Sequence, residues 1–345
     1  MKILLGLSGG VDSTYAALKL IEEGNEVEGA VVLMHEHTSV DEAKESADSL
    51  GIPLHVIDCR EQFKNIVKEN FINEYLLGRT PNPCVICNSE VKFISLLKYA
   101  EEHGFDKIAT GHYASVEKMS DERGSYFGIK RSADLHKDQT YMLWRLPQSV
   151  LSKLVLPLFD ITKTDVRKKT SEKSLRAADR PDSQEICFLP DGGYAEFIES
   201  ERGASPHGAF VDESGNILGE HNGIIRYTIG QRRGLGISSA ARLFVTDINV
   251  ESNVITLSHN DSYSKLVKIA GVVYSGMREP RFGETHRLSV KLRYAAKPTE
   301  ALVTFFGDRA EIELDEPARA VTPGQSAVIY GGDLLVAGGF IDSAT

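Results

Sequence analysis

The chain has 345 residues, of which 41% are hydrophobic and 26% charged, and its formal net charge is −10. This length predicts two or three domains, and no run of about 18 apolar residues is present to cross a membrane. Four cysteines exclude a disulfide-rich secreted scaffold. The lack of a basic and apolar leader predicts a cytoplasmic protein, and the negative charge argues against a general nucleic-acid coat protein.

The first expected elements are a strand at 2–7, a glycine-rich turn at Ser8–Ser13 and a helix at 14–23. The two glycines let backbone N–H groups approach a phosphate, and the helix start adds free donors and partial positive charge. A Walker loop requires a lysine that this turn lacks. Asp12 follows the glycines instead, where a carboxylate fits if it acts through a metal ion. The turn resembles the pyrophosphate-binding loop of enzymes that cleave ATP between its α and β phosphates. An ordinary strand-to-helix turn is the alternative.

Strands and helices alternate through the first half of the chain, with strands expected at 27–34, 54–57 and 106–110 and helices at 41–50, 61–77 and 90–103. This alternation predicts βαβ units and a parallel sheet, and therefore the α/β class. Ligands bind such sheets at the carboxyl ends of the strands. The glycine-rich turn falls at that edge, and so do Gly111 and His112.

The cysteines give a second signal. Cys84 and Cys87 form a Cys-x-x-Cys just before the helix expected at 90–103, and Cys187 lies far along the chain. A thiol near a helix N-terminus has a lowered pKa, which predicts that Cys87 is mostly thiolate at neutral pH. A structural zinc site would need Cys187 and a histidine as further ligands. For Cys59 we expect an inert core position behind a strand.

Residues 163–180 hold seven Lys or Arg and three acidic residues. Such a run is typical of a solvated helix face, and it would equally suit contacts with nucleic-acid phosphates.

The pattern changes near residue 190, where short apolar segments and turns predict one or two small β-barrels or sandwiches. We expect domains at 1–190, 200–267 and 268–345, with the second boundary near 265–270. The loop 228–237 carries two arginines among glycines, which suits approach to a nucleic-acid backbone, with a β-hairpin as the alternative. Strands are expected at 209–211, 217–218, 224–227, 243–245, 254–257, 288–292, 301–305 and 327–330.

Several long strings in this order resemble the bacterial tRNA-specific 2-thiouridylases nearly from end to end. They are GLSGGVDS (6–13), TPNPCVICNSEVKF (80–93), IATGHYA (108–114), KDQTYMLWRL (137–146), DSQEICFLPDGGYAEF (182–197), GEHNGIIRYTIGQRRGLGI (219–237), LRYAAKP (292–298) and DEPARAVTPGQSAVIYGGD (315–333). The resemblance implies an adenine nucleotide α-hydrolase-like (PP-loop) domain followed by two small, mainly β domains.

The resemblance also implies the reaction. The 2-oxygen of the wobble uridine of tRNA is adenylated by ATP with Mg²⁺ near Asp12, and sulfur then replaces it with release of AMP. Cys187 would carry the persulfide, and Cys87 would attack it, releasing sulfide or leaving a disulfide. The ATP contacts implied are Gly6, Leu7, Ser8, Gly9, Gly10, Val11, Asp12, Ser13, Val32 and Gly111.

The tRNA, recognised at its anticodon stem-loop, would have its target base contacted by Asn82, Pro83 and Cys84. Further tRNA contacts implied are His112, Lys137, Asp138, Gln139, Arg293, Tyr294 and Gln325. Many relatives carry Asp at the position of Cys84, which leaves the acid–base role open. The sulfur would come from a partner such as a cysteine desulfurase or a sulfur carrier, and no membrane is involved.

Three alternatives stay open. Cys84, Cys87 and Cys187 could ligate an iron–sulfur cluster with one open iron, although we expect none. The chain could be another PP-loop adenylating enzyme, which has no need of paired cysteines at 87 and 187. It could also be a nucleotide-sensing, metal-binding module without turnover. Metal content and ATP–pyrophosphate exchange distinguish these readings.

Overall fold

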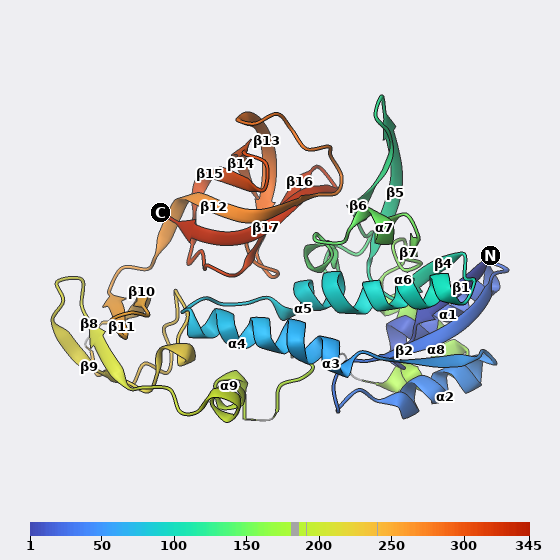
Figure 1. Ribbon diagram of the computed structural model, residues 1–345, viewed down its shortest axis with the longest axis horizontal. Helices are drawn as coiled ribbons and strands as arrows, with labels where there is room; N and C mark the ends of the chain where they lie inside the picture. The colour runs from blue at the N-terminus through green and yellow to red at the C-terminus, as the bar shows by residue number, and fades with distance from the viewer. Residues whose placement is uncertain (181–185, 191, 240) are drawn as a thin grey trace.

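A computed structural model of the chain describes residues 1–180, 186–190, 192–239 and 241–345 (Figure 1). Part of the string at 182–197 therefore lies outside the described residues. The described chain forms a parallel-sheet domain, a small four-stranded domain and a β-barrel. Among these residues no helix is both long and apolar enough to cross a bilayer.

The N-terminal domain contains a five-stranded parallel sheet in the order β3-β2-β1-β4-β7, which confirms the predicted α/β class. Side chains of the central strand alternate between two cores: Ile3 and Leu5 pack with α1, and Leu4 packs on the opposite face with α6. Burial on both faces explains why this strand reads as a continuous apolar run. The strands are β1 (Lys2–Gly6), β2 (Glu26–Leu33), β3 (Leu54–Asp58), β4 (Lys107–Thr110) and β7 (Leu154–Val155).

The four expected helices are present, and the domain also contains shorter helices that the sequence pattern did not predict. The segment expected as one helix at 61–77 contains a π-helical stretch, and so does the helix before β4, which starts at Pro83 rather than at 90. The helices described in this domain are α1 (Val11–Glu22), α2 (Val40–Leu50), α3 (Arg60–Phe63), η1 (Lys64–Lys68), α4 (Glu69–Leu76), α5 (Pro83–Ile86), η2 (Cys87–Lys92), α6 (Phe93–Glu102), η3 (Thr140–Met142), α7 (Gln148–Leu151), α8 (Lys163–Glu172), η4 (Arg176–Asp179) and α9 (Tyr194–Arg202).

The C-terminal strands close into a barrel, because β12 pairs with both β15 and β17. The boundary expected near 265–270 falls inside β12. The barrel strands are β12 (Tyr263–Tyr274), β13 (Glu284–Lys291), β14 (Thr299–Phe305), β15 (Arg309–Arg319), β16 (Ser326–Gly331) and β17 (Leu334–Ala344).

A hairpin of the N-terminal domain extends this barrel sheet. It consists of β5 (Ala114–Asp121) and β6 (Gly124–Arg131), and β6 pairs with β17 at Leu334 and Leu335. Figure 1 shows the hairpin rising from the parallel-sheet domain beside the barrel. The two domains are also joined by side chains, since the Tyr141 hydroxyl donates to Ser326 O at 2.8 Å and Trp144 Nε1 donates to Ser326 Oγ at 3.0 Å. The barrel is therefore docked on the N-terminal domain.

The middle domain is a four-stranded sheet in the order β10-β11-β8-β9. The expected strand at 224–227 is wrong: Ile224–Arg226 is a 3₁₀ turn (η5). The hairpin alternative for 228–237 is also wrong, since these residues form a loop without strands, and Arg232 and Arg233 are exposed on it. Backbone bonds from Gly230 and Gln231 to Val245 hold the loop against β10 instead. The strands are β8 (Gly208–Val211), β9 (Ile217–His221), β10 (Phe244–Asn249) and β11 (Val254–Ser258).

Candidate nucleotide and sulfur-transfer site

The loop Ser8–Ser13 connects β1 to α1 and is held by its own side chains. Ser13 Oγ accepts from Ser8 N at 3.2 Å and donates to Gly10 O at 3.1 Å. Gly9 has a φ of +82°, and a Cβ there would lie 2.4 Å from the backbone of Glu42. The loop therefore combines a backbone conformation that favours glycine with a close approach to α2.

Gly111 allows a second close approach, between the end of β4 and the start of α1. A Cβ on Gly111 would lie 2.8 Å from Asp12 C and Ser13 N, which is backbone that cannot swing aside. The predicted nucleotide residue is thus a glycine for a steric reason. It lets the end of β4 approach the first turn of α1 at the carboxyl edge of the sheet, where ligands bind.

The loop opens into a cavity of about 570 Å³ at this edge of the sheet. The structure brings most predicted nucleotide residues together there, and it adds Cys187 and His112 to the same walls. Gly10 and Val11 line a neighbouring cavity of about 290 Å³ instead. The predicted nucleotide residues in the larger cavity are Gly6, Leu7, Ser8, Asp12, Ser13, Val32 and Gly111.

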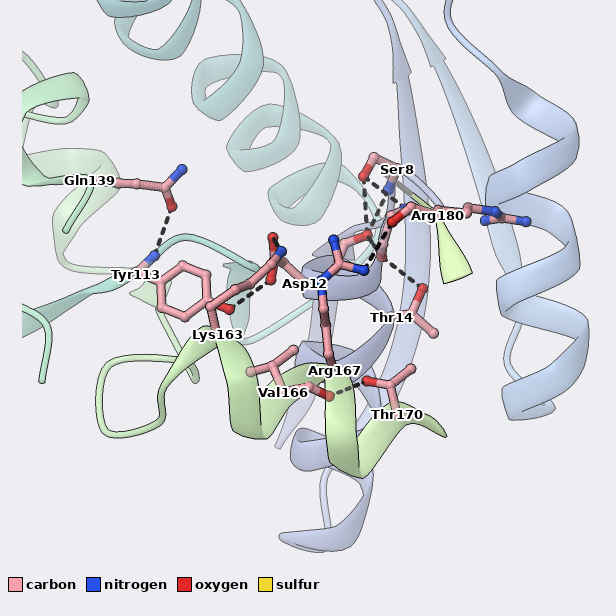
Figure 2. A network of polar contacts seen from close by, with 12 residues as sticks. Ser8, Asp12, Thr14, Tyr113, Gln139, Lys163, Val166, Arg167, Thr170 and Arg180 are labelled. Atoms are coloured by element: carbon pink, nitrogen blue, oxygen red, sulfur yellow. Dashed lines mark hydrogen bonds and ion pairs between the residues drawn. The ribbon is translucent and has the colours of Figure 1, made fainter. Parts of the chain in front are cut away.

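Asp12 is held at both carboxylate oxygens (Figure 2). The Tyr113 hydroxyl donates to Oδ1 at 2.7 Å, and Lys163 Nζ donates to Oδ2 at 2.6 Å. Mg²⁺ is commonly held by one or two carboxylates together with substrate phosphates. A single oriented carboxylate beside a phosphate-binding loop fits that donor set.

The basic run at 163–180 packs against the back of the loop. Arg180 donates to Gly9 O and pairs with Glu45, which also pairs with Arg176. Lys173 pairs with Glu22 at 2.7 Å. Much of the positive charge in this run is therefore used within the chain, which explains the run better than either a solvated face or a surface for nucleic acid.

Cys87 does not have the lowered pKa expected from its sequence position. It is 7% exposed, and burial raises the pKa of its thiol to about 12, with Lys92 acting weakly in the opposite direction. The physical reason is that the helix begins at Pro83, so Cys87 lies one turn inside it rather than at its N-terminus. Desolvation of the thiolate then exceeds any effect of the helix end.

The cysteines nevertheless gather around Cys87. Negative charge on Cys187, Cys84 or Cys59 would raise the pKa of Cys87 further. Cys187 is exposed, and the neighbouring Phe188 anchors it by packing against Phe63 and Phe71 at ring-centroid distances of 5.5 and 5.3 Å. All four cysteines are free thiols.

Cys59 is buried, in agreement with the expected core position, and its Sγ donates to Ser95 Oγ at 3.1 Å. Within the described part of the chain, no group of three or more His, Cys, Asp or Glu side chains is arranged to hold a metal ion.

The residues expected to contact the target base lie at the start of α5. Asn82 and Pro83 are buried, and Asn82 Nδ2 lies 3.7 Å from Met142 Sδ, whereas Cys84 is exposed. His112 is half-buried, and burial lowers its pKa to about 3. Its imidazole is therefore neutral at physiological pH.

The residues expected to contact tRNA divide into two groups. Lys137, Gln139 and Tyr294 line the 290 Å³ cavity, where a ligand could touch them. The others make contacts within the chain: Asp138 accepts from Thr140 Oγ1 at 2.9 Å, Arg293 donates to Ala320 O and Thr322 Oγ1, and Gln325 Nε2 donates to Thr80 O and Pro81 O at 3.0 and 3.1 Å.

Each of the three domains matches a family model of its own. Residues 1–191 match the tRNA methyl transferase HUP domain, 195–259 the tRNA methyl transferase PRC-barrel domain and 265–341 the aminomethyltransferase beta-barrel domain. The tRNA-specific 2-thiouridylase MnmA of Acetivibrio thermocellus is 42% identical, with 99% of each chain covered. This chain belongs to the tRNA-specific 2-thiouridylase family. The enzyme of the same name from Clostridioides difficile is 41% identical, with 99% of this chain and 98% of that one covered.

Solved structures resemble the 2-thiouridylase chain over about half its length. A 4-thiouridine synthetase in complex with RNA and ATP has a TM-score of 0.37 and 19% identity, covering 54% of this chain and 44% of that one. An NMN synthetase from Francisella tularensis has a TM-score of 0.34 and 15% identity, covering 52% and 66%. Similarity this low adds nothing to the assignment.

Three residues at this site were not predicted from the sequence. Lys163 and Tyr113 hold Asp12 from distant segments. His35 lines the larger cavity, is 9% exposed, and its Nδ1 has no hydrogen-bond partner among the described residues. Lys163 could have been suspected as the first residue of a basic run, but tertiary packing alone reveals its partner.

Proposed function

We propose that this chain is an ATP-dependent sulfurtransferase that replaces the 2-oxygen of the wobble uridine of tRNA with sulfur. The observation that carries the proposal is that Cys187 lines the same cavity as the phosphate-binding loop. A base bound there would face both an activating nucleotide and a sulfur carrier. Family membership supports the same reaction, since the curated relatives are named as tRNA-specific 2-thiouridylases.

The first half-reaction activates the base. The uracil 2-oxygen attacks the α-phosphorus of ATP, the bond from that phosphorus to the bridging oxygen breaks, and pyrophosphate leaves with the electron pair while the N3 proton passes to solvent. Ser8, Gly10 and Ser13 lie where the phosphates would bind, and the start of α1 offers N–H donors to them. A bound Mg²⁺, held by Asp12 and the phosphates, would supply charge stabilisation.

The second half-reaction delivers sulfur. The Cys87 thiolate attacks Sγ of the Cys187 persulfide, a Cys87–Cys187 disulfide forms, and the terminal sulfur leaves as sulfide. Sulfide attacks carbon 2 of the uracil and AMP departs; a thiol reductant then restores both cysteines. Because Cys87 is buried and keeps its proton at neutral pH, its thiolate forms as that proton passes to the terminal sulfur of the ionised persulfide, which leaves as HS⁻. The buried thiol would react only when Cys187 is loaded beside it, which limits wasteful release of sulfide.

The partners we propose are tRNA, bound through its anticodon stem-loop, and a protein donor of persulfide sulfur. The cavity walls formed by Lys137, Gln139 and Tyr294 would meet the tRNA beside the loop. Arg293 and Gln325 are proposed to touch tRNA as well; in the chain itself, Arg293 bonds to Thr322 within the barrel, and Gln325 joins the barrel to the Thr80–Pro81 segment.

The proposal is tested by combining the purified protein with ATP, Mg²⁺, tRNA and a cysteine desulfurase with cysteine, followed by mass analysis of the tRNA nucleosides. We expect ATP-dependent 2-thiouridine together with AMP and pyrophosphate. AMP and pyrophosphate without thiolated tRNA would indicate another PP-loop adenylating enzyme, and tight nucleotide binding without turnover would indicate a sensing module. Nucleosides from cells lacking the gene provide the matching test in vivo.

A further inference from the structure

The second cavity beside the phosphate-binding loop holds two lysines. It has a volume of about 290 Å³, and Lys137 and Lys163 are in its walls. Ser8, Asp12 and Ser13 line both this cavity and the larger one. An anionic group bound across the loop would therefore face both cations.

Lys163 is placed by its helix so that its ammonium faces the loop. It is the first residue of α8 and only 8% exposed. A lysine is rarely buried unless it is paired with an opposite charge. Its Nζ lies 2.6 Å from Asp12 Oδ2, as Figure 2 shows. The Thr162 side chain caps the helix, and Lys163 N donates to Asp134 Oδ2 at 3.0 Å. The backbone at this position is thus fastened on both sides.

The charges at the loop explain why a buried cation is useful there. ATP brings several negative charges, whereas a helix N-terminus supplies only about half a positive charge. Asp12 adds a further negative charge, and pairing with Lys163 offsets its repulsion of phosphate. A lysine ammonium is a compact charge with three N–H donors, so one ammonium can contact a carboxylate and a phosphate oxygen together.

We propose that Lys163 binds the pyrophosphate portion of ATP while it orients Asp12. The proposal rests on the function proposed above, in which the bond between the α-phosphorus and the bridging oxygen breaks. The electron pair of that bond leaves on the bridging oxygen, and Lys163 stabilises the negative charge of the departing pyrophosphate. Lys163 is thus a binding residue of the ATP site that no motif near the loop reveals.

The test compares Lys163→Met with Lys168→Met, which removes the same charge from an exposed position on the same helix. Binding of ATP, inorganic pyrophosphate and AMP is measured by calorimetry with EDTA present, so that no metal contributes. We expect Lys163→Met to weaken ATP and pyrophosphate roughly 10- to 100-fold. AMP, which has no β-phosphate, should change less than about threefold, and Lys168→Met should leave all three affinities near those of the wild type.

Two further measurements keep the result decisive. Circular dichroism and the unfolding midpoint show whether Lys163→Met is folded, and Lys163→Arg, which keeps the charge, should recover part of the pyrophosphate affinity. Equal pyrophosphate affinity in Lys163→Met and Lys168→Met, or an equal loss for AMP and ATP, would overturn the proposal. A wild type that binds neither ATP nor pyrophosphate, with EDTA or with Mg²⁺ present, would instead overturn the proposed function.

Discussion

At the scale of single residues, Cys87 shows how burial overrides a sequence rule. The Cys-x-x-Cys before a helix predicts a reactive thiolate, but the structure surrounds Cys87 with apolar side chains and holds Met34 Sδ 3.3 Å from its Sγ. A thiol there keeps its proton at neutral pH. Cys87 is buried and Cys187 is exposed. In the proposed mechanism this difference would leave Cys187 accessible to an incoming sulfur donor.

The pH dependence of alkylation follows from this difference. Iodoacetamide should label Cys87 at least about tenfold more slowly than Cys187 at pH 8. Only the thiolate reacts, and below the pKa each added pH unit raises the thiolate fraction about tenfold. Peptide mass spectrometry over pH 7–10 measures both rates. Labelling of Cys87 that is fast and insensitive to pH in this range would contradict the raised pKa.

The same shift has a consequence for stability. Because the folded protein holds the Cys87 proton more tightly than the unfolded chain does, the folded state gains stability from the protonated thiol below the ordinary thiol pKa near 9. That contribution should be lost as the pH rises from about 9 toward the folded pKa of about 12. Urea unfolding in this window should show a steeper fall for the wild type than for Cys87→Ser.

Substitution of the two functional cysteines should separate them from Cys59. Cys87→Ser and Cys187→Ser should each lower tRNA thiolation by more than about 100-fold. Cys59→Ser should retain near-normal activity, because Cys59 is a buried core residue that is hydrogen-bonded to Ser95. After incubation with a cysteine desulfurase, mass spectrometry should find about 32 added mass units on the peptide with Cys187. Activity that survives in Cys187→Ser would contradict the persulfide mechanism.

Substitution of Cys84 tests whether an iron–sulfur cluster takes part in thiolation. We expect protein purified without oxygen to be colourless and active with ATP, Mg²⁺ and a persulfide donor, and Cys84→Asp to keep substantial activity. A carboxylate at this exposed position could still hydrogen-bond the uracil or accept a proton. Iron content and absorbance are measured beside activity. A brown wild type that loses iron and activity together in air would show that the three cysteines hold a cluster.

At the scale of elements, the site depends on how closely β1, α1 and the end of β4 meet. Gly9 of the loop lies close to the backbone of α2, and Gly111 at the end of β4 lies close to the backbone of α1. The same contact orients the first turn of α1, where Asp12 and Ser13 stand. The elements that bind the nucleotide are therefore coupled by backbone contact as well as by side chains.

Gly111→Ala should weaken ATP binding at least about tenfold, because a methyl group at 2.8 Å from the α1 backbone forces the first turn to move. Gly104→Ala is the control. Gly104 also turns the chain, with a φ of +71°, but a Cβ there meets nothing within 4 Å. Gly104→Ala should lower the free energy of unfolding by about 1 kcal/mol and leave the ATP affinity unchanged. Unaltered ATP binding in Gly111→Ala would show that the close approach is dispensable.

At the scale of the whole molecule, the segment 78–81 is where three domains meet. Thr80 N donates to Pro323 O in the barrel, Thr80 Oγ1 lies 3.3 Å from Thr228 Oγ1 of the middle domain, and Gly78 lies against Ile248. The segment leads directly into Asn82, Pro83 and Cys84. Both β domains can therefore influence the position of the residues that we expect to contact the base.

Gln325→Glu tests this connection. Replacing the amide donor by a carboxylate would place negative charge against the carbonyls of Thr80 and Pro81, which should cost about 1–3 kcal/mol of unfolding free energy. Thiolation should fall severalfold, while ATP affinity stays near normal because the phosphate-binding loop lies elsewhere. Gln62→Glu, on the exposed side of α3, is the control. A loss of ATP affinity equal to the loss of thiolation would contradict a role confined to the base-binding segment.

The sequence by itself determined the parallel sheet, the glycine-rich loop between β1 and α1, and the burial expected for Cys59. Hydrophobic periodicity and glycine placement act over a few residues, so they can be read along the chain. Only the tertiary structure decided the contacts between segments that lie far apart in the sequence. Lys163 reaches Asp12 across 151 residues, the β5–β6 hairpin joins the barrel, and Cys87 is buried by neighbours from other elements. Burial and charge pairing are set by which segments meet, and that information is spread over the whole chain.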